Sequence, residues 1–381
     1  MPTLLDVTVG WAPPTGGSKQ TADISTAPKA PNAHTLYDSE RLYQENVRRR
    51  VKKRRPTLQD IADQVGATKM TVSRCLRDPE TVSEGLRERI FEVAEQLGYI
   101  PNRGPDILSK STSRAIGVLL PSLTNQVFAD VIKGIETVTE PLGYHLMLAH
   151  YGYSQELEER SLASLLSYNV DGVILSESQH TERTLRMLET AGIPTVEIMD
   201  THSHAIHQAV GFDNVEAAYE MVRTMIERGR RHILYLAVRL DARTLQRQEG
   251  YNRAMTEAGL TPQTLRRSER SSYSVGATLM DEILEHHPEA DGLFCTNDDV
   301  AVGAYFECLR RGVTVPGQMA IAGFHGHDVG QVMAPRLASV VTPREAVGER
   351  AARELLQRLQ GQAVKETAID LGYRIEVGGT I

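Results

Sequence analysis

The sequence is poor in the features of exported, membrane or disulfide-linked proteins. It has three cysteines, Cys75, Cys295 and Cys308, an odd number without C-x-x-C spacing. This usage fits small buried side chains kept reduced in a cytoplasm. No apolar run approaches the roughly 18 residues of a membrane span. The first residues lack the basic and apolar regions of a secretory signal, so we expect a cytoplasmic protein.

Motifs of the common enzyme classes are also missing. The chain has no G-x-G-x-x-G turn, no G-x-S-x-G elbow and no H-E-x-x-H pair. His325, His327 and Asp328 cluster in sequence, but their spacing matches no standard metal site. We therefore predict neither an enzyme, nor a cofactor, nor a metal.

Charge is distributed unevenly along a chain whose formal net charge is -7. Residues 48–103 hold 13 Lys and Arg against 8 Asp and Glu, whereas residues 104–381 hold 26 against 36. A small basic unit joined to a larger acidic one is typical of a nucleic-acid-binding protein with a separate control module.

The stretch from Thr57 to Leu76 has the pattern of a helix-turn-helix. Apolar residues recur from Leu58 to Val65 at helical spacing, and Gly66 then permits the left-handed turn that ends a helix. Thr68 is a suitable N-cap for a second helix. The pattern alone also fits two helices of an ordinary all-α bundle. In a DNA-binding protein, the start of the second helix would face the bases of the major groove.

The residues that follow favour the DNA-binding interpretation. A third apolar stripe opens after Thr81 or Ser83 and closes at Gly98, before Tyr99-Ile100-Pro101-Asn102-Arg103. From Thr57 to Leu108 the chain resembles the DNA-binding headpiece of the lactose-repressor and galactose-repressor family. We assign residues 51–101 to this headpiece and residues 102–112 to a hinge helix or linker.

The resemblance implies specific DNA contacts. Lys69, Met70 and Arg74 would touch base edges, and Leu108 would wedge between base pairs in the minor groove. The alternative for Leu108 is packing against its own domain. The complete set of predicted DNA-binding residues is Thr57, Leu58, Thr68, Lys69, Met70, Thr71, Ser73, Arg74, Asn102 and Leu108.

Residues 1–50 show no sustained periodicity and are rich in Pro, Gly, Thr, Ser and Ala. We predict that they are disordered, or that they are upstream sequence with Val51 as the true initiator. N-terminal sequencing of the native protein decides between these readings. The basic run that ends at Arg55 is either an arm along DNA phosphates or a solvated tail.

Residues 113–381 alternate short apolar runs with helical stretches, the first run being Ala115 to Leu120. This βαβ alternation predicts parallel sheets covered by helices, and the number of runs favours two doubly wound lobes. The resemblance implies the same fold: an α/β effector domain like that of periplasmic binding proteins, which also forms the dimer. Ligands then bind in the cleft at the carboxyl ends of the strands.

Residues that directly follow strands are the candidates for this cleft. The predicted effector contacts are Ser122, Asn125, Phe128, His180, Arg243, Asn297, Asp298, His325, Thr342 and Arg344. Two further residues have open alternatives: Glu197 is either a ligand contact or a buried paired carboxylate, and Arg247 is either a cleft residue or a solvated helix residue. Phe128 lies on a helical stripe, where a core role competes with a ligand contact.

The effector is predicted to be acidic. Many family members carry an aspartate at the position of His325, where a carboxylate would repel an anion and an imidazole would not. Arg243 and Arg344 supply guanidinium groups suited to a carboxylate. Stretches such as Ile321 to His327 resemble the family's gluconate-responsive repressors. The resemblance implies gluconate or a related sugar acid such as idonate.

These inferences combine into a homodimeric repressor of sugar-acid uptake and utilisation genes, bound to a near-palindromic double-stranded operator and released by its effector. One alternative keeps the DNA binding but makes the protein an activator, as an idonate-type regulator would be. Another is a sugar-binding protein without DNA function, which would leave residues 57–108 unexplained.

Overall fold

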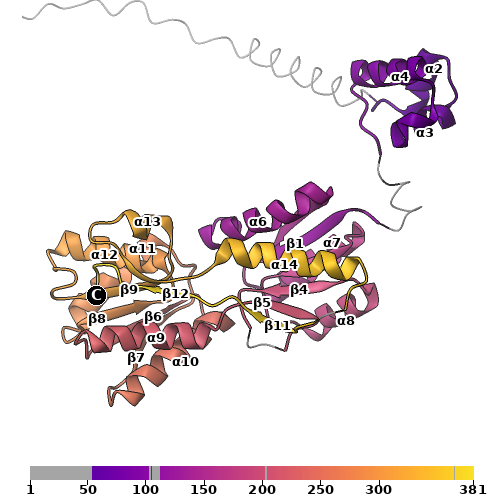
Figure 1. The fold of residues 1–381 in the computed structure, drawn as a ribbon. Helices are drawn as coiled ribbons and strands as arrows, with labels where there is room; N and C mark the ends of the chain where they lie inside the picture. Colours follow the sequence, from indigo (N-terminus) through magenta and orange to yellow (C-terminus); the bar gives the residue numbers. More distant parts are fainter. Residues whose placement is uncertain (1–53, 103, 105–111, 202–203, 364) are drawn as a thin grey trace, which may run out of the picture. The chain divides into compact units, whose positions relative to one another are not determined.

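The computed structural model describes residues 54–102, 104, 112–201, 204–363 and 365–381. The chain divides into two compact units between Asn102 and Arg103 (Figure 1). Leu108 and most of the predicted linker, like Val51 and the residues before it, lie outside the described ranges.

The first unit is a small helical domain. Its elements are α2 (Leu58–Val65), α3 (Lys69–Arg77), the 3₁₀ turn η1 (Pro79–Thr81) and α4 (Glu84–Leu97). Both predicted glycine stops occur: Gly66 and Gly98 have φ angles of 75° and 65°. Ser83, not Thr81, precedes the third helix. The core contains Ile61, Ala62, Val65, Val72, Cys75, Ile90 and Ala94.

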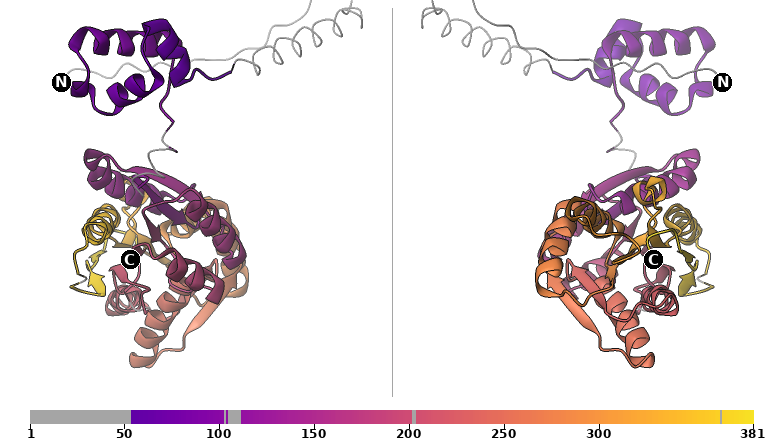
Figure 2. Two further views of the ribbon diagram at one scale, coloured as in Figure 1. Left: turned by 90° about the vertical axis from the view of Figure 1, so that its right-hand side faces the viewer. Right: turned by 90° about the vertical axis from the view of Figure 1, so that its left-hand side faces the viewer.

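The second unit consists of two lobes, each built on a six-stranded sheet in the described residues (Figures 1 and 2). The N-lobe sheet has the order β11-β5-β4-β3-β1-β2, and its paired strands are parallel. Its elements are β1 (Ala115–Leu120), α6 (Gln126–Thr139), η2 (Glu140–Leu142), β2 (His145–His150), α7 (Gln155–Ser167), β3 (Gly172–Leu175), α8 (Glu182–Ala191), β4 (Thr195–Ile198), β5 (Gln208–Gly211), α14 (Arg344–Leu359) and β11 (Ala368–Asp370).

The C-lobe sheet has the order β12-β10-β9-β8-β6-β7 and is parallel apart from the β10–β12 pair. Its elements are α9 (Asn214–Glu227), β6 (Ile233–Val238), α10 (Ala242–Glu257), β7 (Gln263–Arg267), α11 (Tyr273–His286), β8 (Gly292–Cys295), α12 (Asp298–Arg311), β9 (Ala320–His325), α13 (Asp328–Val332), β10 (Ala338–Val341) and β12 (Arg374–Glu376). The predicted fold class, a helix-turn-helix headpiece with a two-lobed α/β domain, is confirmed.

The chain passes between the lobes after β5, after β10 and after β11. Residues that follow β3 and β4 and the last residue of β9 bond to the other lobe, so these carboxyl ends lie at the junction of the lobes, where doubly wound sheets bind ligands. Near the C-terminus, β11 and β12 are short strands in different sheets, because the chain crosses between the lobes after β11. Polar or short strands such as β5 and β7 were not predicted, since neither gives an apolar run.

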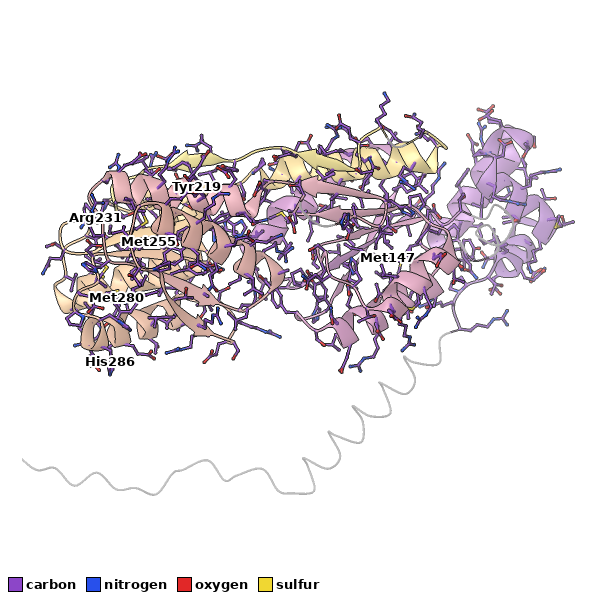
Figure 3. All side chains as sticks on the ribbon, turned by 90° about the horizontal axis from the view of Figure 1, so that it is seen from below. Met147, Tyr219, Arg231, Met255, Met280 and His286 are labelled. Atoms are coloured by element: carbon purple, nitrogen blue, oxygen red, sulfur yellow. The ribbon has the colours of Figure 1, made fainter. Side chains whose placement is uncertain are left out.

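Helices α14 and α6 approach each other closely at two glycines, which have no Cβ. A Cβ added at Gly348 on α14 would collide with the carbonyl oxygen of Val131 on α6, and one added at Gly134 would collide with that of Glu345. These two helices cover one face of the N-lobe. Figure 3 shows Met147 in the N-lobe and the fully buried Met255 and Met280 among the C-lobe helices.

Of the helices in the described ranges, none combines the length and apolar composition that a bilayer crossing requires. The same ranges contain no group of three or more His, Cys, Asp or Glu side chains that could hold a metal.

Candidate DNA-binding face and effector cleft

Hydrogen bonds from threonines fix the start of both helices of the helix-turn-helix. Thr68 Oγ1 accepts from the backbone N–H of Thr71 at 3.1 Å, so α3 begins with a satisfied cap. Thr57 caps α2 reciprocally, because its backbone N–H donates to Asp60 Oδ2 at 2.7 Å. Hydrogen bonds from Thr57 lower the pKa of Asp60. Thr57, Thr68 and Thr71, all predicted DNA contacts, thus also stabilise the N-terminal turns of α2 and α3.

The outer face of α3 presents side chains that the domain core does not use. Lys69, Met70 and Arg74 are exposed, and Met70 keeps 74% of its surface accessible. Within the described residues, Lys69 and Arg74 have no carboxylate partner. Thr71 and Ser73 flank them and are half-buried. An exposed methionine between two unpaired cations has no evident role in folding, which makes this face a candidate DNA-binding surface.

Leu58 and Asn102, two other predicted DNA contacts, differ in burial. Leu58 is half-buried and packs against the helical core. Asn102 is exposed at the end of the first unit. Their DNA contacts, like that of Leu108, remain predictions.

Arg243 connects the two lobes of the second unit. It lies in the first turn of α10, is 5% exposed, and its Nη1 donates to the carbonyl oxygen of Ser176 beyond β3. Burial by itself would lower the pKa of Arg243, but the charges of Asp241 and Glu177 outweigh it and raise the pKa. A permanently charged guanidinium therefore lies buried at the carboxyl ends of the strands.

Arg239 adds a second buried cation at the same edge. Its φ is 59°, and its Nε donates to Asp241 Oδ2 at 2.8 Å. The guanidinium carbon lies 4.5 Å from the ring centroid of Tyr153 in the N-lobe. Burial would raise the pKa of Asp241, yet Arg239 and Arg243 together lower it. Asp241 is thus a carboxylate shared between two arginines.

Arg247 is the most deeply buried arginine of this group, with 1% exposure. It donates to Asn214 Oδ1 at 3.0 and 3.1 Å and to the carbonyl oxygen of Thr296 at 2.6 Å. Its guanidinium carbon lies 3.8 Å from the ring centroid of Phe324. Burial lowers the pKa of Arg247 to about 10. The alternative of a solvated helix residue is wrong, because α10 turns this face inward.

His325 lies between Arg247 and Thr342. Arg247 Nη2 is 3.2 Å from His325 Nε2, and Thr342 Oγ1 is 3.2 Å from Nδ1. Arginine offers only donors, so Nε2 accepts and the ring proton is on Nδ1, donating to Thr342. Burial and the charge of Arg247 lower the pKa of His325 well below its usual range. The imidazole is neutral and its N–H is already used within the protein.

Arg344 also joins the lobes. Its Nε donates to Asp130 Oδ2 on α6 at 2.7 Å, and its Nη1 donates to the carbonyl oxygen of His325. Gln246 makes a further contact across the cleft, donating to Asp200 at 2.8 Å. The structure therefore brings His325, Thr342 and Arg344 together, and Arg247, whose pKa the charges of Arg243 and Arg239 also affect, connects them to the arginines of α10.

Asn297 and Asp298 lie at the carboxyl end of β8 and are occupied by the protein itself. Asn297 caps α12 and donates to Ser271 Oγ at 2.9 Å. Asp298 accepts from Ser339 Oγ at 2.7 Å and from the backbone N–H of His327 at 2.5 Å. Burial raises the pKa of Asp298 to about 6. Its carboxylate therefore connects the residues that follow β8 to the segment after β9 and to β10.

His180 belongs to a buried cluster within the N-lobe. Its Nδ1 lies 2.8 Å from Glu158 Oε1 and its Nε2 lies 3.3 Å from Glu197 Oε1. Burial would lower the pKa of His180, but the two carboxylates raise it to about 9. Glu197 also accepts from the backbone N–H of Ile206 at 2.7 Å, so it is a paired carboxylate. Both ring nitrogens of His180 are thereby engaged inside the protein.

The remaining predicted contacts follow β1. Asn125 caps α6 by accepting from the backbone N–H of Val127 at 3.0 Å. Phe128 is 4% exposed and belongs to the hydrophobic core. Ser122 is half-buried, with Oγ 3.1 Å from Thr124 Oγ1. Their effector contacts remain predictions.

Sequence reasoning missed the full extent of the cationic cluster. Arg239, Arg243 and Arg247 recur every four residues, so a helical projection of the start of α10 would have placed Arg243 and Arg247 on one face. The contribution of Tyr153 could not be found in this way, because it comes from the other lobe.

Comparison with known proteins bears on both units. Residues 113–375 match the family described as periplasmic binding proteins and sugar binding domain of LacI family. Residues 57–102 match bacterial regulatory proteins, lacI family. The chain belongs to the LacI family of bacterial transcriptional regulators. This membership excludes a sugar-binding protein without a DNA-binding unit, and LacI-family regulators are not enzymes.

Particular LacI-family proteins are similar over nearly their whole length. The HTH-type transcriptional regulator GntR of Escherichia coli K12 is 59% identical over 331 residues, 87% of this chain and 100% of the relative. The regulator IdnR of the same organism is 46% identical over 328 residues, covering 86% and 99%. A LacI-family regulator from Silicibacter pomeroyi superposes with a TM-score of 0.80 at 33% identity, covering 85% and 99% of the two chains.

Proposed function

We propose that this LacI-family regulator is a homodimeric repressor of sugar-acid uptake and utilisation genes, and that gluconate or a closely related sugar acid releases it from its operator. In this function the exposed face of α3 binds the operator, and the arginine cluster of the second unit binds the effector. A regulator of DNA acts where the chromosome lies, so we place it in the cytoplasm.

The observation that carries the choice of an acidic effector is the buried positive charge of the cleft. Arg239, Arg243 and Arg247 are each less than 10% exposed, and the carboxylates that act on these three cations are Asp241 and Glu177. A buried cation without a full complement of anions is costly, and a ligand carboxylate supplies the missing charge. The neutral His325 leaves this field intact, whereas an aspartate at that position would cancel part of it.

The hydroxyl groups of a sugar acid find partners beside the arginines. Thr342 and Ser122 offer hydroxyl groups after β10 and β1, and Asn297, whose amide already bonds within the protein, helps to shape the pocket. We propose that Arg243, with Arg344, grips the carboxylate. We assign Asn125, Phe128, His180 and Asp298 to shaping and supporting the pocket, because their polar atoms or rings are already engaged.

Release follows from the bonds that span the cleft. Arg243 donates to Ser176, Gln246 to Asp200, and Arg344 to the carbonyl of His325. A bound carboxylate competes for Arg243 and Arg344, so ligand binding changes the relative free energy of the lobe arrangements. It can release DNA only to the extent that it prefers the arrangement that is incompetent for DNA binding.

On DNA, we propose that each subunit places α3 in the major groove of one half-site. Lys69, Met70 and Arg74 would read base edges, with Met70 suited to the methyl group of thymine. Thr57, Thr68, Thr71, Ser73 and Asn102 would fix the register on the phosphates, Leu58 would contact the DNA beside them, and Leu108 would enter the minor groove. The two-fold symmetry of the dimer then requires a near-palindromic operator.

A mobility-shift titration on the promoter of a sugar-acid uptake operon tests the proposal. We expect a specific complex that dissociates with gluconate and is unaffected by galactose or a purine base. Arg243→Gln should retain DNA binding and lose the gluconate response. Arg223→Gln, which alters an exposed arginine on α9, is the matched control.

A complex that ignores sugar acids and responds to neutral sugars would refute the acidic effector. Reporter assays with the operator upstream or downstream of the promoter start then decide the sign of regulation. Repression from the native position supports the proposal, whereas activation favours the idonate-type alternative.

A further inference from the structure

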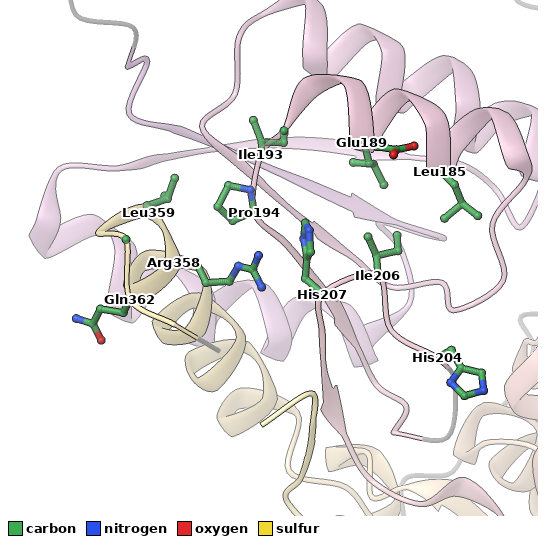
Figure 4. A pocket seen from close by; sticks show the side chains of 13 residues that line it. Leu185, Glu189, Ile193, Pro194, His204, Ile206, His207, Arg358, Leu359 and Gln362 are labelled. Carbon is green, nitrogen blue, oxygen red and sulfur yellow. The ribbon is translucent and has the colours of Figure 1, made fainter. Parts of the chain in front are cut away.

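A second pocket lies in the N-lobe, away from the effector cleft. It has a volume of about 780 Å³ and is bounded by α8, by the segments that lead into β4 and β5, and by the end of α14 (Figure 4). Pro194 and His207 directly precede β4 and β5. The pocket therefore lies at the amino-terminal edge of the sheet, and the cleft lies at the carboxyl-terminal edge.

Arg358 lines this pocket, and no carboxylate of the described ranges pairs with it. The other three arginines of α14 each pair with a carboxylate: Arg344 with Asp130, Arg350 with Glu354, and Arg353 with Glu349. Among the described residues, the guanidinium of Arg358 has no hydrogen-bond or ion-pair partner, although it is half-buried. A cation in the last turn complements the helix dipole. The helix dipole explains why a cation is favourable at this position, but it gives no hydrogen-bond partner to the five N–H donors of the guanidinium.

His207 supplies a second donor beside Arg358. Its Nδ1 accepts from the backbone N–H of Thr195 at 3.2 Å, so a neutral ring carries its proton on Nε2. Burial and the charge of Arg358 both lower the pKa of His207, which favours this neutral form. In Figure 4 the two side chains come from different elements of the lining, Arg358 from α14 and His207 from the segment before β5. An acceptor lying between them would receive bonds from both.

The remaining walls are largely apolar. Leu185, Leu188, Ile193, Pro194, Ile206 and Leu359 contribute hydrocarbon surface. Glu189 is the acidic side chain of the lining and is exposed. Pockets of ~300 to 1,000 Å³ with apolar walls and a few convergent donors are typical of small-ligand sites.

We propose that this pocket binds a small organic anion, a phosphate or carboxylate group carried on an apolar body. Arg358 holds the anionic group in bidentate fashion, His207 Nε2 donates a further hydrogen bond, and the apolar walls cover the body. Ile193 and Leu359 also border the adjoining cavity that contains Thr112, close to where the chain enters β1. The proposed site therefore lies at the same edge of the N-lobe as Thr112, which precedes β1.

Calorimetry on the full-length protein in phosphate-free buffer tests this site. The probes are phenyl phosphate and benzoate, with benzyl alcohol as the neutral analogue. We expect saturable binding of at least one anion and none of the alcohol. Arg358→Gln should weaken anion binding about tenfold or more, because charge-assisted hydrogen bonds are lost. Comparison of the two anions tells whether the site prefers phosphate or carboxylate.

Two control variants separate this pocket from other cations. Arg353→Gln removes an exposed, paired arginine of the same helix and should leave binding unchanged. Arg243→Gln disables the cleft and should also leave it unchanged. Binding that is abolished by Arg243→Gln, that persists in Arg358→Gln, or that never saturates would overturn the proposal.

Discussion

Nη2 of Arg247 lies 3.2 Å from Nε2 of His325, and this contact makes the histidine an acceptor. The ring proton is consequently on Nδ1 and is donated to Thr342 at 3.2 Å. His325, which the sequence predicts as an effector contact, is therefore a neutral side chain that accepts a hydrogen bond from a buried guanidinium. Because His325 is neutral, it does not cancel the positive charge of Arg247, and the cleft retains that charge.

Replacing His325 by aspartate should weaken gluconate binding. The new carboxylate would pair with Arg247 and oppose a second carboxylate in the cleft, so we expect about tenfold lower affinity by calorimetry. His325→Asn keeps the site neutral and should lose less. Equal gluconate affinity for His325→Asp and the unaltered protein would contradict this account.

Lys69 and Met70 should determine which operator sequence is preferred. If Lys69 reads a base edge, Lys69→Ala should cost about 1–3 kcal/mol on the specific operator and relax discrimination at one position. Met70→Ala should change preference at a neighbouring base pair. Binding to a randomised operator library measures both effects.

Lys133→Ala is the control for net charge, because Lys133 is an exposed residue of the second unit. A uniform loss of affinity on all sequences, with a smaller salt dependence, would show that Lys69 contacts phosphate instead.

His180 should make the stability of the effector domain depend on pH. Glu158 and Glu197 overcome the effect of burial and raise the pKa of His180 from 6.5 to about 9 in the folded protein. The folded state therefore binds the proton more tightly than the unfolded state. This contribution is fully present below 6.5 and is lost as the pH rises through about 9, by an amount of order 3 kcal/mol.

Denaturant titrations across this pH interval measure the effect. His180→Gln should flatten the pH dependence, whereas His286→Gln, at an exposed position on α11, should leave it unchanged. A protein without His180 that loses stability just as steeply would show that other groups are responsible.

Gly348→Ala should destabilise the effector domain. The added methyl group would meet the carbonyl oxygen of Val131, so α14 and α6 must separate, at a cost of about 1–3 kcal/mol. Thermal unfolding measures the loss. Gly85 on α4 has no atom within 4 Å of an added Cβ, so Gly85→Ala should not lower the stability of its own domain. A neutral Gly348→Ala would indicate that the helix pair adjusts freely.

Local patterns in the sequence determined much of the fold. The helical spacing from Leu58 to Val65, the stops at Gly66 and Gly98, and the apolar runs of β1, β3 and β8 depend on neighbouring residues. Family membership also followed from contiguous stretches. Arg243, His325, Thr342 and Arg344 could be predicted as effector contacts because each was expected just after a strand, and they lie at the end of a strand or near the start of a helix.

Only the tertiary structure decided what these side chains contact. Arg247 contacts His325, which lies 78 residues later in the chain. His180 lies between the carboxylates of Glu158 and Glu197. Among the residues that the structure describes, Arg358 pairs with no carboxylate, although the other arginines of α14 do. The physical reason is that burial and electrostatic pairing depend on distances between distant parts of the chain, which periodicity and propensity do not encode.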